Sequence, residues 1–262
     1  MVSSLVQLVI EEGIAVITIN NPPMNVLSST VTKELKETVS QIYTDPEVIV
    51  VIITGSGDRA FMAGADIKEF PQWLHLEKKE LRKVTTANHE VFNMIENMPK
   101  PTIAAINGLA LGGGCELALA CDIRIAEEQA KLGLPEVKLG LFPGAGGTQR
   151  MPRLVGEAKA KELMYIGDPV TAEEAFAIGL VNHIVPTGTG LERAKDMARK
   201  MAGQSLQALS RIKQAVNDGS DMDLLSGLEL EIDLFLDIFK THDVREGVQA
   251  FIEKRSARFT HN

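Results

Sequence analysis

The sequence has few cysteines, few histidines and no long hydrophobic run, and each shortage excludes a class of protein. Two cysteines, Cys115 and Cys121, in 262 residues cannot form a disulfide framework and fit a reducing compartment. The longest uninterrupted aliphatic run, Val48–Ile53, is far too short to span a bilayer. The first ten residues lack the basic start and apolar stretch of a signal peptide. We therefore expect a cytoplasmic protein that does not enter the membrane.

Positive charge is also in short supply, which argues against a nucleic-acid partner. The chain carries 27 Lys plus Arg against 35 Asp plus Glu, a net charge of −8. Sequence-independent affinity for nucleic acid comes from Lys and Arg neutralising phosphates, so we expect no nucleic-acid partner. Apolar residues make up 45% of the chain, too many for a disordered protein.

Several catalytic and binding motifs are missing as well. The sequence has no Gly-Lys pair, hence no phosphate-binding P-loop, and no Gly-x-Ser-x-Gly nucleophile elbow. The five histidines are scattered without the spacing of metal ligands, so we expect no metal site. The Gly144–Gln149 segment begins like a dinucleotide fingerprint but has Gln149 where the third glycine belongs, so nucleotide binding there is disfavoured.

Short aliphatic runs alternate with helical patterns in the first half of the chain. Predicted helices include one marked by Val31, Leu35, Val39 and Ile42 and a long one ending before Pro99. The predicted strands are Leu5–Ile10, Ile14–Ile19, Val48–Thr54, Thr102–Asn107 and Ile123–Ala126. A helix is predicted over Leu111–Ala120. Strands separated by crossover helices imply an α/β core with partly parallel pairing.

The second half is mostly helical. Thr171 to Glu174 forms a capping-box pattern, and the last helix is predicted to run from Asp243 as its N-cap to about Phe259. A composition shift near residue 200 predicts an α/β core over residues 1–200 and a helical region over 201–262. The other predicted elements are helices at Thr148–Val155, Glu157–Ile166, Leu191–Met201, Leu206–Val216 and Leu224–Phe239, and a strand at Val181–Val185.

A triple glycine makes the segment from Asn107 to Glu116 unusual. Glycines at a strand-to-helix junction allow close backbone approach and leave free N–H groups at the helix start. Such N–H groups can stabilise a developing oxyanion, but the same glycines also serve tight helix–sheet packing. The segment by itself leaves both interpretations open. The Phe61–Lys68 segment reads as a loop that could supply a second N–H group.

Two glutamates stand in apolar surroundings. Glu116 begins a nearly apolar helix, and Glu136 follows Leu134-Pro135 and precedes Val137. Burial raises the pKa of a carboxyl group, and two poorly solvated carboxylates suit general acid–base chemistry. The alternative is that each is an ordinary surface or helix-capping glutamate.

Taken together, these segments resemble the enoyl-CoA hydratase/isomerase family, also called the crotonase superfamily. The resemblance covers nearly the whole chain and rests on the order and spacing of several motifs. These are Ala63–Lys68, Ile103–Glu116, Pro135–Gly140, Pro143–Gly147, and Arg245-Glu246-Gly247 followed by Phe251–Arg255. It implies a spiral of ββα turns with a helical C-terminal region, and a homotrimer or homohexamer.

The resemblance also implies roles for particular residues. The backbone N–H groups of Ala65 and Gly113 would hold the carbonyl oxygen of an acyl-CoA thioester. Glu116 and Glu136 would handle the water and its protons, although the division of acid and base roles between them stays open. Residues implied to contact the substrate or its CoA are Ala63, Ala65, Asp66, Ile67, Lys68, Gly113, Gly144 and Lys254.

The implied activity is reversible syn hydration of a trans-2-enoyl-CoA to a 3-hydroxyacyl-CoA, in fatty-acid β-oxidation. It needs no metal or redox cofactor, because coenzyme A is part of the substrate. Alternatives are an enoyl-CoA isomerase and a hydratase for a branched or dicarboxylic enoyl-CoA. An RNA-binding relative is disfavoured, because the Ser29–Tyr43 helix has Lys33 and Lys36 balanced by two glutamates. The Phe70–Lys83 segment, where relatives vary most, leaves the acyl-chain preference open.

Overall fold

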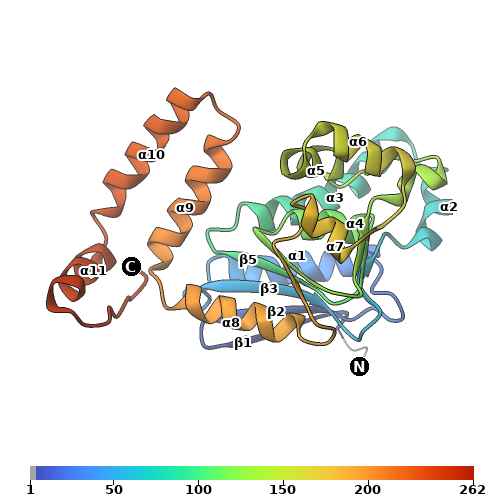
Figure 1. Ribbon diagram of the computed structural model, residues 1–262. Helices are drawn as coiled ribbons and strands as arrows, with labels where there is room; N and C mark the ends of the chain where they lie inside the picture. Colours follow the sequence, from blue (N-terminus) through green and yellow to red (C-terminus); the bar gives the residue numbers. More distant parts are fainter. Residues whose placement is uncertain (1–3) are drawn as a thin grey trace.

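A computed structural model describes residues 4–262, and two sheets organise its first two thirds (Figure 1). In the larger sheet the first two strands pair antiparallel and all the others pair parallel. Its spatial order is β1 (Val6–Glu11), β2 (Ile14–Ile19), β3 (Val50–Gly55), β5 (Thr102–Ile106), β7 (Ile123–Glu127) and β10 (His183–Val185). The smaller sheet has the order β4 (Ala60–Ala63), β6 (Leu109–Leu111), β8 (Lys131–Gly133) and β9 (Val170–Thr171).

From β3 to β8, consecutive strands alternate between the two sheets. β3, β5 and β7 lie in the larger sheet, and each is followed within a few residues by a strand of the smaller one. A helical segment follows each such pair, so the chain repeats a ββα turn three times. This is the predicted α/β spiral, and the prediction of fold class is confirmed.

The central strand β3 explains the aliphatic run in the sequence. All six of its residues are buried, because helices and loops cover both faces of the sheet. Val51 and Ile53 belong to the core on one face, and Val50 and Ile52 belong to the core on the other. The second core is closed by Ala194 and Ala198 of α8 (Gly190–Ala202), which packs along the larger sheet.

The remaining helices surround these layers. Those before residue 178 are α1 (Ser29–Tyr43), α2 (Phe70–Trp73), α3 (Lys78–Glu96), α4 (Gly113–Leu119), α5 (Gly147–Val155), α6 (Glu157–Ile166) and α7 (Ala172–Ala177), with short 3₁₀ turns η1 (Ile67–Glu69) and η2 (Pro135–Leu139). The capping box at Thr171 and Glu174 opens α7, as predicted.

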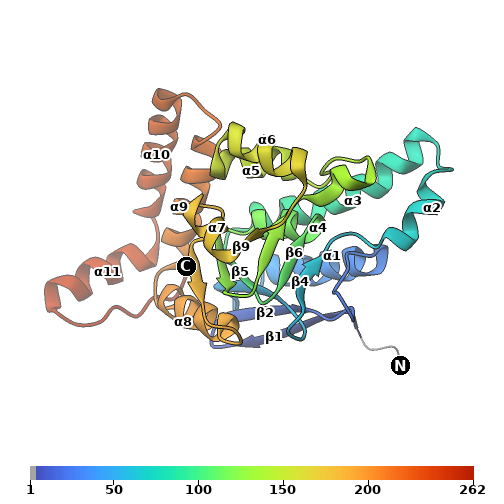
Figure 2. The same ribbon diagram turned by 45° about the vertical axis from the view of Figure 1, so that its right-hand side comes forward.

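The C-terminal helices stand away from the sheets. Figures 1 and 2 both show α9 (Leu206–Gly219), α10 (Leu224–Ile238) and α11 (His242–Glu253) projecting from one side of the body. α9 is tied to the body by an ion pair of 2.9 Å between Lys213 and Asp122. The structure thus places the predicted helical region after α8, while its independence as a domain stays a prediction.

The last helix differs from its prediction at both ends. The cap is Thr241, whose hydroxyl accepts the N–H of Val244, and not Asp243. Asp243 is buried, and its carboxylate instead accepts the backbone N–H groups of Thr260, at 2.8 Å, and His261. It therefore holds the C-terminal segment against the helix start. The helix ends at Glu253 and not near Phe259, because Lys254 adopts a left-handed conformation with φ 55°.

Two other local predictions need correction. Residues 60–63, most of them placed in a loop by the sequence, form strand β4. The helix predicted from Leu111 begins at Gly113, because Leu109–Leu111 pairs with β8 as strand β6. Both errors have one cause: strands of three or four residues are too short to show a hydrophobic period.

Candidate active site

The start of helix α4 is shaped by its glycines. Gly112, the N-cap, has φ 49° and ψ −123°, and a Cβ there would lie 3.0 Å from Oε1 of Glu136. A Cβ on Gly114 would lie 1.9 Å from the carbonyl oxygen of Met62 in β4. Gly114 therefore serves packing between helix and strand, while Gly112 allows a carboxylate to approach the backbone. The packing interpretation of the triple glycine is confirmed at Gly114, and the oxyanion interpretation stays a prediction.

Two backbone N–H groups without acceptors lie at the ends of neighbouring segments. Ala65 forms a bridge with Leu27, in which Leu27 donates to the Gly64 carbonyl at 2.8 Å and accepts from Asp66 at 3.0 Å. This pattern uses the carbonyl of Gly64 and the N–H of Asp66, the residues on either side of Ala65, and leaves the Ala65 N–H unused. Within residues 4–262, neither the Ala65 nor the Gly113 N–H has a hydrogen-bond partner. They follow β4 and β6, which are neighbours in the smaller sheet.

Glu116 is a buried carboxylate on α4, with only 2% of its surface exposed. Its Oε1 accepts the N–H of Ala145 at 2.8 Å and that of Gly147 at 2.9 Å. Burial raises the pKa of Glu116 above its usual value, and these two hydrogen bonds oppose the rise. The prediction that this glutamate is buried with a raised pKa is confirmed.

Glu136 is half-buried on η2 and lies over the start of α4. Burial raises the pKa of Glu136 to about 7, and the negative charge of Glu116 adds to the effect. Among the described residues, nothing forms a hydrogen bond with its buried Oε2 atom. A carboxyl group with a pKa near neutrality and an unpartnered oxygen is suited to exchanging a proton with a ligand.

The other predicted contact residues fall into two groups. Ala63, Asp66, Ile67 and Lys68 lie at and just after the end of β4, next to Ala65, and Asp66 caps η1 by accepting the Lys68 N–H at 3.1 Å. Gly144 is exposed in the loop that carries Ala145, so it also lies near Glu116.

Lys254 is not brought to this site within one chain. It ends α11, which Figures 1 and 2 show on the far side of the C-terminal helices from α4. Its neighbour Arg255 pairs with Glu246 at 2.6 Å and with Glu253 at 2.7 Å. A role for Lys254 in binding CoA therefore stays a prediction.

The sequence analysis did not predict that the Gly144–Gly147 loop binds the carboxylate of Glu116. Ala145 and Gly147 supply the two N–H groups that bind Glu116, and α5 begins at the end of the same loop. The available signal was a glycine-rich segment that does not follow a strand. Such a loop can present backbone N–H groups to a carboxylate as well as to a phosphate.

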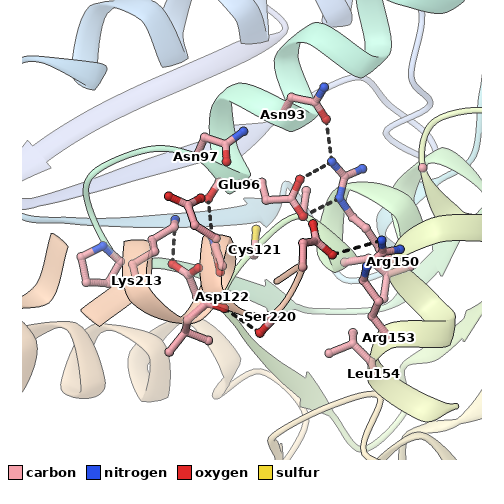
Figure 3. Close-up of a pocket in the computed structure, with 18 of the residues that line it drawn as sticks. Asn93, Glu96, Asn97, Cys121, Asp122, Arg150, Arg153, Leu154, Lys213 and Ser220 are labelled. Carbon is pink, nitrogen blue, oxygen red and sulfur yellow. Dashed lines mark hydrogen bonds and ion pairs between the residues drawn. The ribbon is translucent and has the colours of Figure 1, made fainter. Parts of the chain in front are cut away.

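A cavity of about 1020 Å³ lies beside this loop, between α3, α5 and α9 (Figure 3). It is lined by charged pairs such as Glu96 with Arg150 and Asp122 with Lys213. Neither Glu116 nor Glu136 lines it, so the cavity is separate from the two carboxylates. Over residues 4–262 there is no cluster of metal-ligating side chains, and no helix is long and apolar enough to cross a membrane.

Comparison with known proteins agrees with this geometry. The sequence profile described as enoyl-CoA hydratase/isomerase matches residues 9–262, and the chain belongs to that family. The crotonyl-CoA hydratase of Syntrophomonas wolfei is 48% identical, over 95% of each chain. The short-chain-enoyl-CoA hydratase of Clostridium acetobutylicum is 44% identical, over 94% of this chain and 93% of that one.

A solved structure shows the same fold. The enoyl-CoA hydratase from Bacillus anthracis superimposes with a TM-score of 0.93 at 40% identity, covering 98% of this chain and 100% of the other. Relatives this similar over nearly their whole length identify the chain as an enzyme of the enoyl-CoA hydratase type.

Proposed function

We propose that the protein adds water reversibly to short-chain trans-2-enoyl-CoA thioesters and that Glu116 and Glu136 carry the protons. The observation that carries this proposal is the pair of desolvated carboxylates at the start of α4. One is fixed by two backbone N–H groups, and the other has a pKa near 7 and an unpartnered oxygen. The short-chain preference rests on the names of the two relatives.

The first element of the mechanism is the pair of N–H groups at Ala65 and Gly113. The thioester oxygen gains negative charge as an enolate forms, so donors aimed at it stabilise the transition state more than the bound substrate. Both N–H groups lack a partner in the described chain and are held by backbone that is fixed by the smaller sheet and the Leu27 bridge. They are therefore ready to bind the oxygen without rearranging.

The second element is the division of proton transfers. Ionised Glu116 accepts a proton from water as the water oxygen bonds to the β-carbon of the substrate. Protonated Glu136 gives its proton to the α-carbon, and the electron pair of the double bond forms that new C–H bond by way of the enolate. Both carboxylates serve one face of the substrate, which gives syn addition, and dehydration reverses each step.

Two carboxylates distinguish a hydratase from an isomerase. Moving a double bond from position 3 to position 2 needs one proton shuttle and no water, so a single carboxylate suffices. Here Glu116 is fixed through Oε1 only, which leaves Oε2 available to bind a water molecule. A hydratase acting on a branched or dicarboxylic enoyl-CoA would use the same two groups and differ in its acyl pocket.

We also propose that the enzyme assembles as a trimer or hexamer in the cytoplasm and serves fatty-acid β-oxidation. Support for assembly comes from the C-terminal helices, because many of their large apolar side chains are exposed and do not pack on the core of their own chain. The large exposed ones include Leu224, Leu225, Phe235, Leu236, Phe239, Phe251 and Ile252. Closed symmetry would bury such patches on every copy and could bring Lys254 to a neighbouring subunit's CoA.

The test is hydration of crotonyl-CoA, followed as the loss of absorbance of the conjugated thioester. The panel includes longer, branched and dicarboxylic enoyl-CoAs and a 3-enoyl-CoA for isomerisation. We expect the highest kcat/KM with crotonyl-CoA. A higher value for a branched or dicarboxylic substrate would replace the short-chain assignment, and isomerisation without hydration would refute the hydratase assignment.

A further inference from the structure

The loop that binds Glu116 has an anchor of its own in the buried side chain of Arg150. Arg150 lies on α5, and only 9% of its surface is exposed. Its Nη1 donates to the carbonyl oxygen of Ala145 at 3.2 Å. The same atom is 2.1 Å from where a Cβ would stand on Gly146, so the guanidinium lies directly against the loop backbone.

Ala145 is consequently held on both sides. Its N–H points to Glu116 and its carbonyl points to Arg150. The N–H and the carbonyl of Ala145 lie on either side of its Cα, and both are hydrogen-bonded. A rotation about either backbone dihedral of Ala145 would therefore break a buried hydrogen bond. The position of the N–H that fixes Glu116 is thereby linked to the position of the guanidinium.

The guanidinium is fixed in turn by helix α3. Its Nε and Nη2 donate to the two carboxylate oxygens of Glu96, at 3.0 and 2.5 Å, and Nη2 also donates to Oδ1 of Asn93 at 2.7 Å (Figure 3). A bidentate pair of this kind sets direction as well as distance. Three segments, α3, α5 and the loop before α5, are therefore locked together beside Glu116.

We propose that Arg150 is a positioning residue for hydration, which acts through the Ala145 carbonyl to hold Glu116 in the orientation that activates water. This inference rests on the proposed role of Glu116. In this role Arg150 acts through Ala145 and not by contact with the substrate, so its effect would appear in turnover and not in binding of the CoA ester.

Arg150 also affects Glu116 through its charge. The ionisable groups around Glu116 are His89 on α3, Arg150 on α5, Glu136 on η2 and the neighbouring thiol Cys115. The guanidinium of Arg150, and the imidazole of His89 when it is protonated, lower the pKa of Glu116 and oppose the effect of burial. Loss of the guanidinium should therefore raise the pKa of Glu116, and the acid side of the activity profile should move to higher pH.

The test compares Arg150→Met, Arg150→Lys and Glu96→Gln with Arg153→Met as the matched control. Arg153 lies on the same helix but is exposed and pairs only loosely with Asp221, at 3.3 Å. We expect Arg150→Met to lower kcat for crotonyl-CoA on the order of 10–100-fold, the cost of a small misplacement of a catalytic group, with KM nearly unchanged. The acid limb of the pH–rate profile of Arg150→Met should shift to higher pH.

The companion variants separate charge from geometry. Arg150→Lys keeps the positive charge but loses the paired hydrogen bonds of the guanidinium. The acid limb of its pH–rate profile should therefore shift less than that of Arg150→Met, while kcat remains reduced. Glu96→Gln should lower kcat less than Arg150→Met, since the Asn93 and Ala145 contacts remain. Arg153→Met should match wild type in kcat, KM and pH profile. A purely structural role for Arg150 would lower the melting temperature without moving the acid limb.

Glu116→Gln, alone and combined with Arg150→Met, distinguishes failure of the proposed role of Glu116 from failure of the proposed role of Arg150. If Glu116→Gln keeps wild-type activity, the proposed function of Glu116 fails. If Glu116→Gln is inactive while folded Arg150→Met keeps the wild-type kcat and acid limb, only the role of Arg150 is overturned. If Arg150→Met does not fold, a wild-type kcat in both Arg150→Lys and Glu96→Gln overturns the positioning role of Arg150. We expect the double variant to be no slower than Glu116→Gln alone.

Discussion

The raised pKa of Glu136 leads to a prediction about stability as well as rate. Its carboxyl is shifted from 4.5 to about 7, chiefly by burial. A group whose folded pKa lies above its unfolded value binds protons more tightly in the folded state. It therefore costs stability as pH rises from about 4.5 through 7, and the full cost is present above both values.

The magnitude follows from the size of the shift. A shift from 4.5 to about 7 would correspond to roughly 3 kcal/mol, at about 1.4 kcal/mol for each pKa unit. Because Glu136 is only half-buried, solvent screening reduces this to on the order of 1–2 kcal/mol. Glu136→Gln is uncharged at every pH, so it should unfold at higher denaturant concentration than wild type at pH 8 and at about the same concentration at pH 4.

The same substitution should abolish proton delivery to the α-carbon. An amide preserves the shape but carries no transferable proton, so hydration of crotonyl-CoA should fall by roughly 10²–10⁴-fold. In wild type, activity should decline above pH 7 as Glu136 ionises, and the residual activity of the variant should lack that decline.

Urea unfolding at the two pH values, together with a pH–rate profile, checks both statements. Thr148→Ala, on the nearby first turn of α5, serves as a control that leaves the charge of the site unchanged. Activity of Glu136→Gln within a factor of a few of wild type would remove Glu136 from the mechanism. Equal stability of both proteins at pH 8 would refute the desolvation argument.

Four further outcomes are expected. Glu116→Gln should abolish hydration but harm any 3-to-2 isomerisation of a 3-enoyl-CoA less, and an equal loss of both would contradict the proposed division of roles. Gly114→Ala should destabilise the protein by more than about 1 kcal/mol in urea unfolding, because its Cβ would meet the Met62 carbonyl at 1.9 Å; unchanged stability would be inconsistent with that packing. Analytical ultracentrifugation at micromolar concentration should show a trimer or hexamer, and a species of 28.5 kDa would refute assembly. Lys254→Ala should raise KM for CoA esters with little change in kcat, and an unchanged KM would leave Lys254 without a role in CoA binding.

The proposed chemistry costs the folded protein stability, and neighbouring elements offset part of this cost. Glu116 and Glu136 are kept out of water, where each would be more stable as an anion. Glu116 recovers part of this loss through two N–H groups, whereas the buried Oε2 of Glu136 recovers none from the described chain. The carboxyl left uncompensated is the one assigned to carry a proton at neutral pH.

The local sequence pattern predicted an element correctly where the residues of that element alone determine it. The β-branched run at Val48–Ile53 identified a strand buried on both faces, and the Thr171–Glu174 pattern identified a helix start. It failed at Asp243, which has the side chain of a helix cap and lies beside the true cap, Thr241. The competing partners of Asp243, the N–H groups of Thr260 and His261, come from a segment 17 and 18 residues away.

The sequence by itself determined the alternation of strands and helices, the acidic charge balance, and the order of motifs that identified the family and Glu116 and Glu136. Only the tertiary structure decided the hydrogen-bond partners, charges and burial of those glutamates. Glu116 meets the N–H of Ala145, 29 residues along the chain, and Arg150 meets Glu96, 54 residues away. A carboxyl group's pKa depends on the water, dipoles and charges around it, and here these come from segments that only the packing of two sheets and α3 brings together.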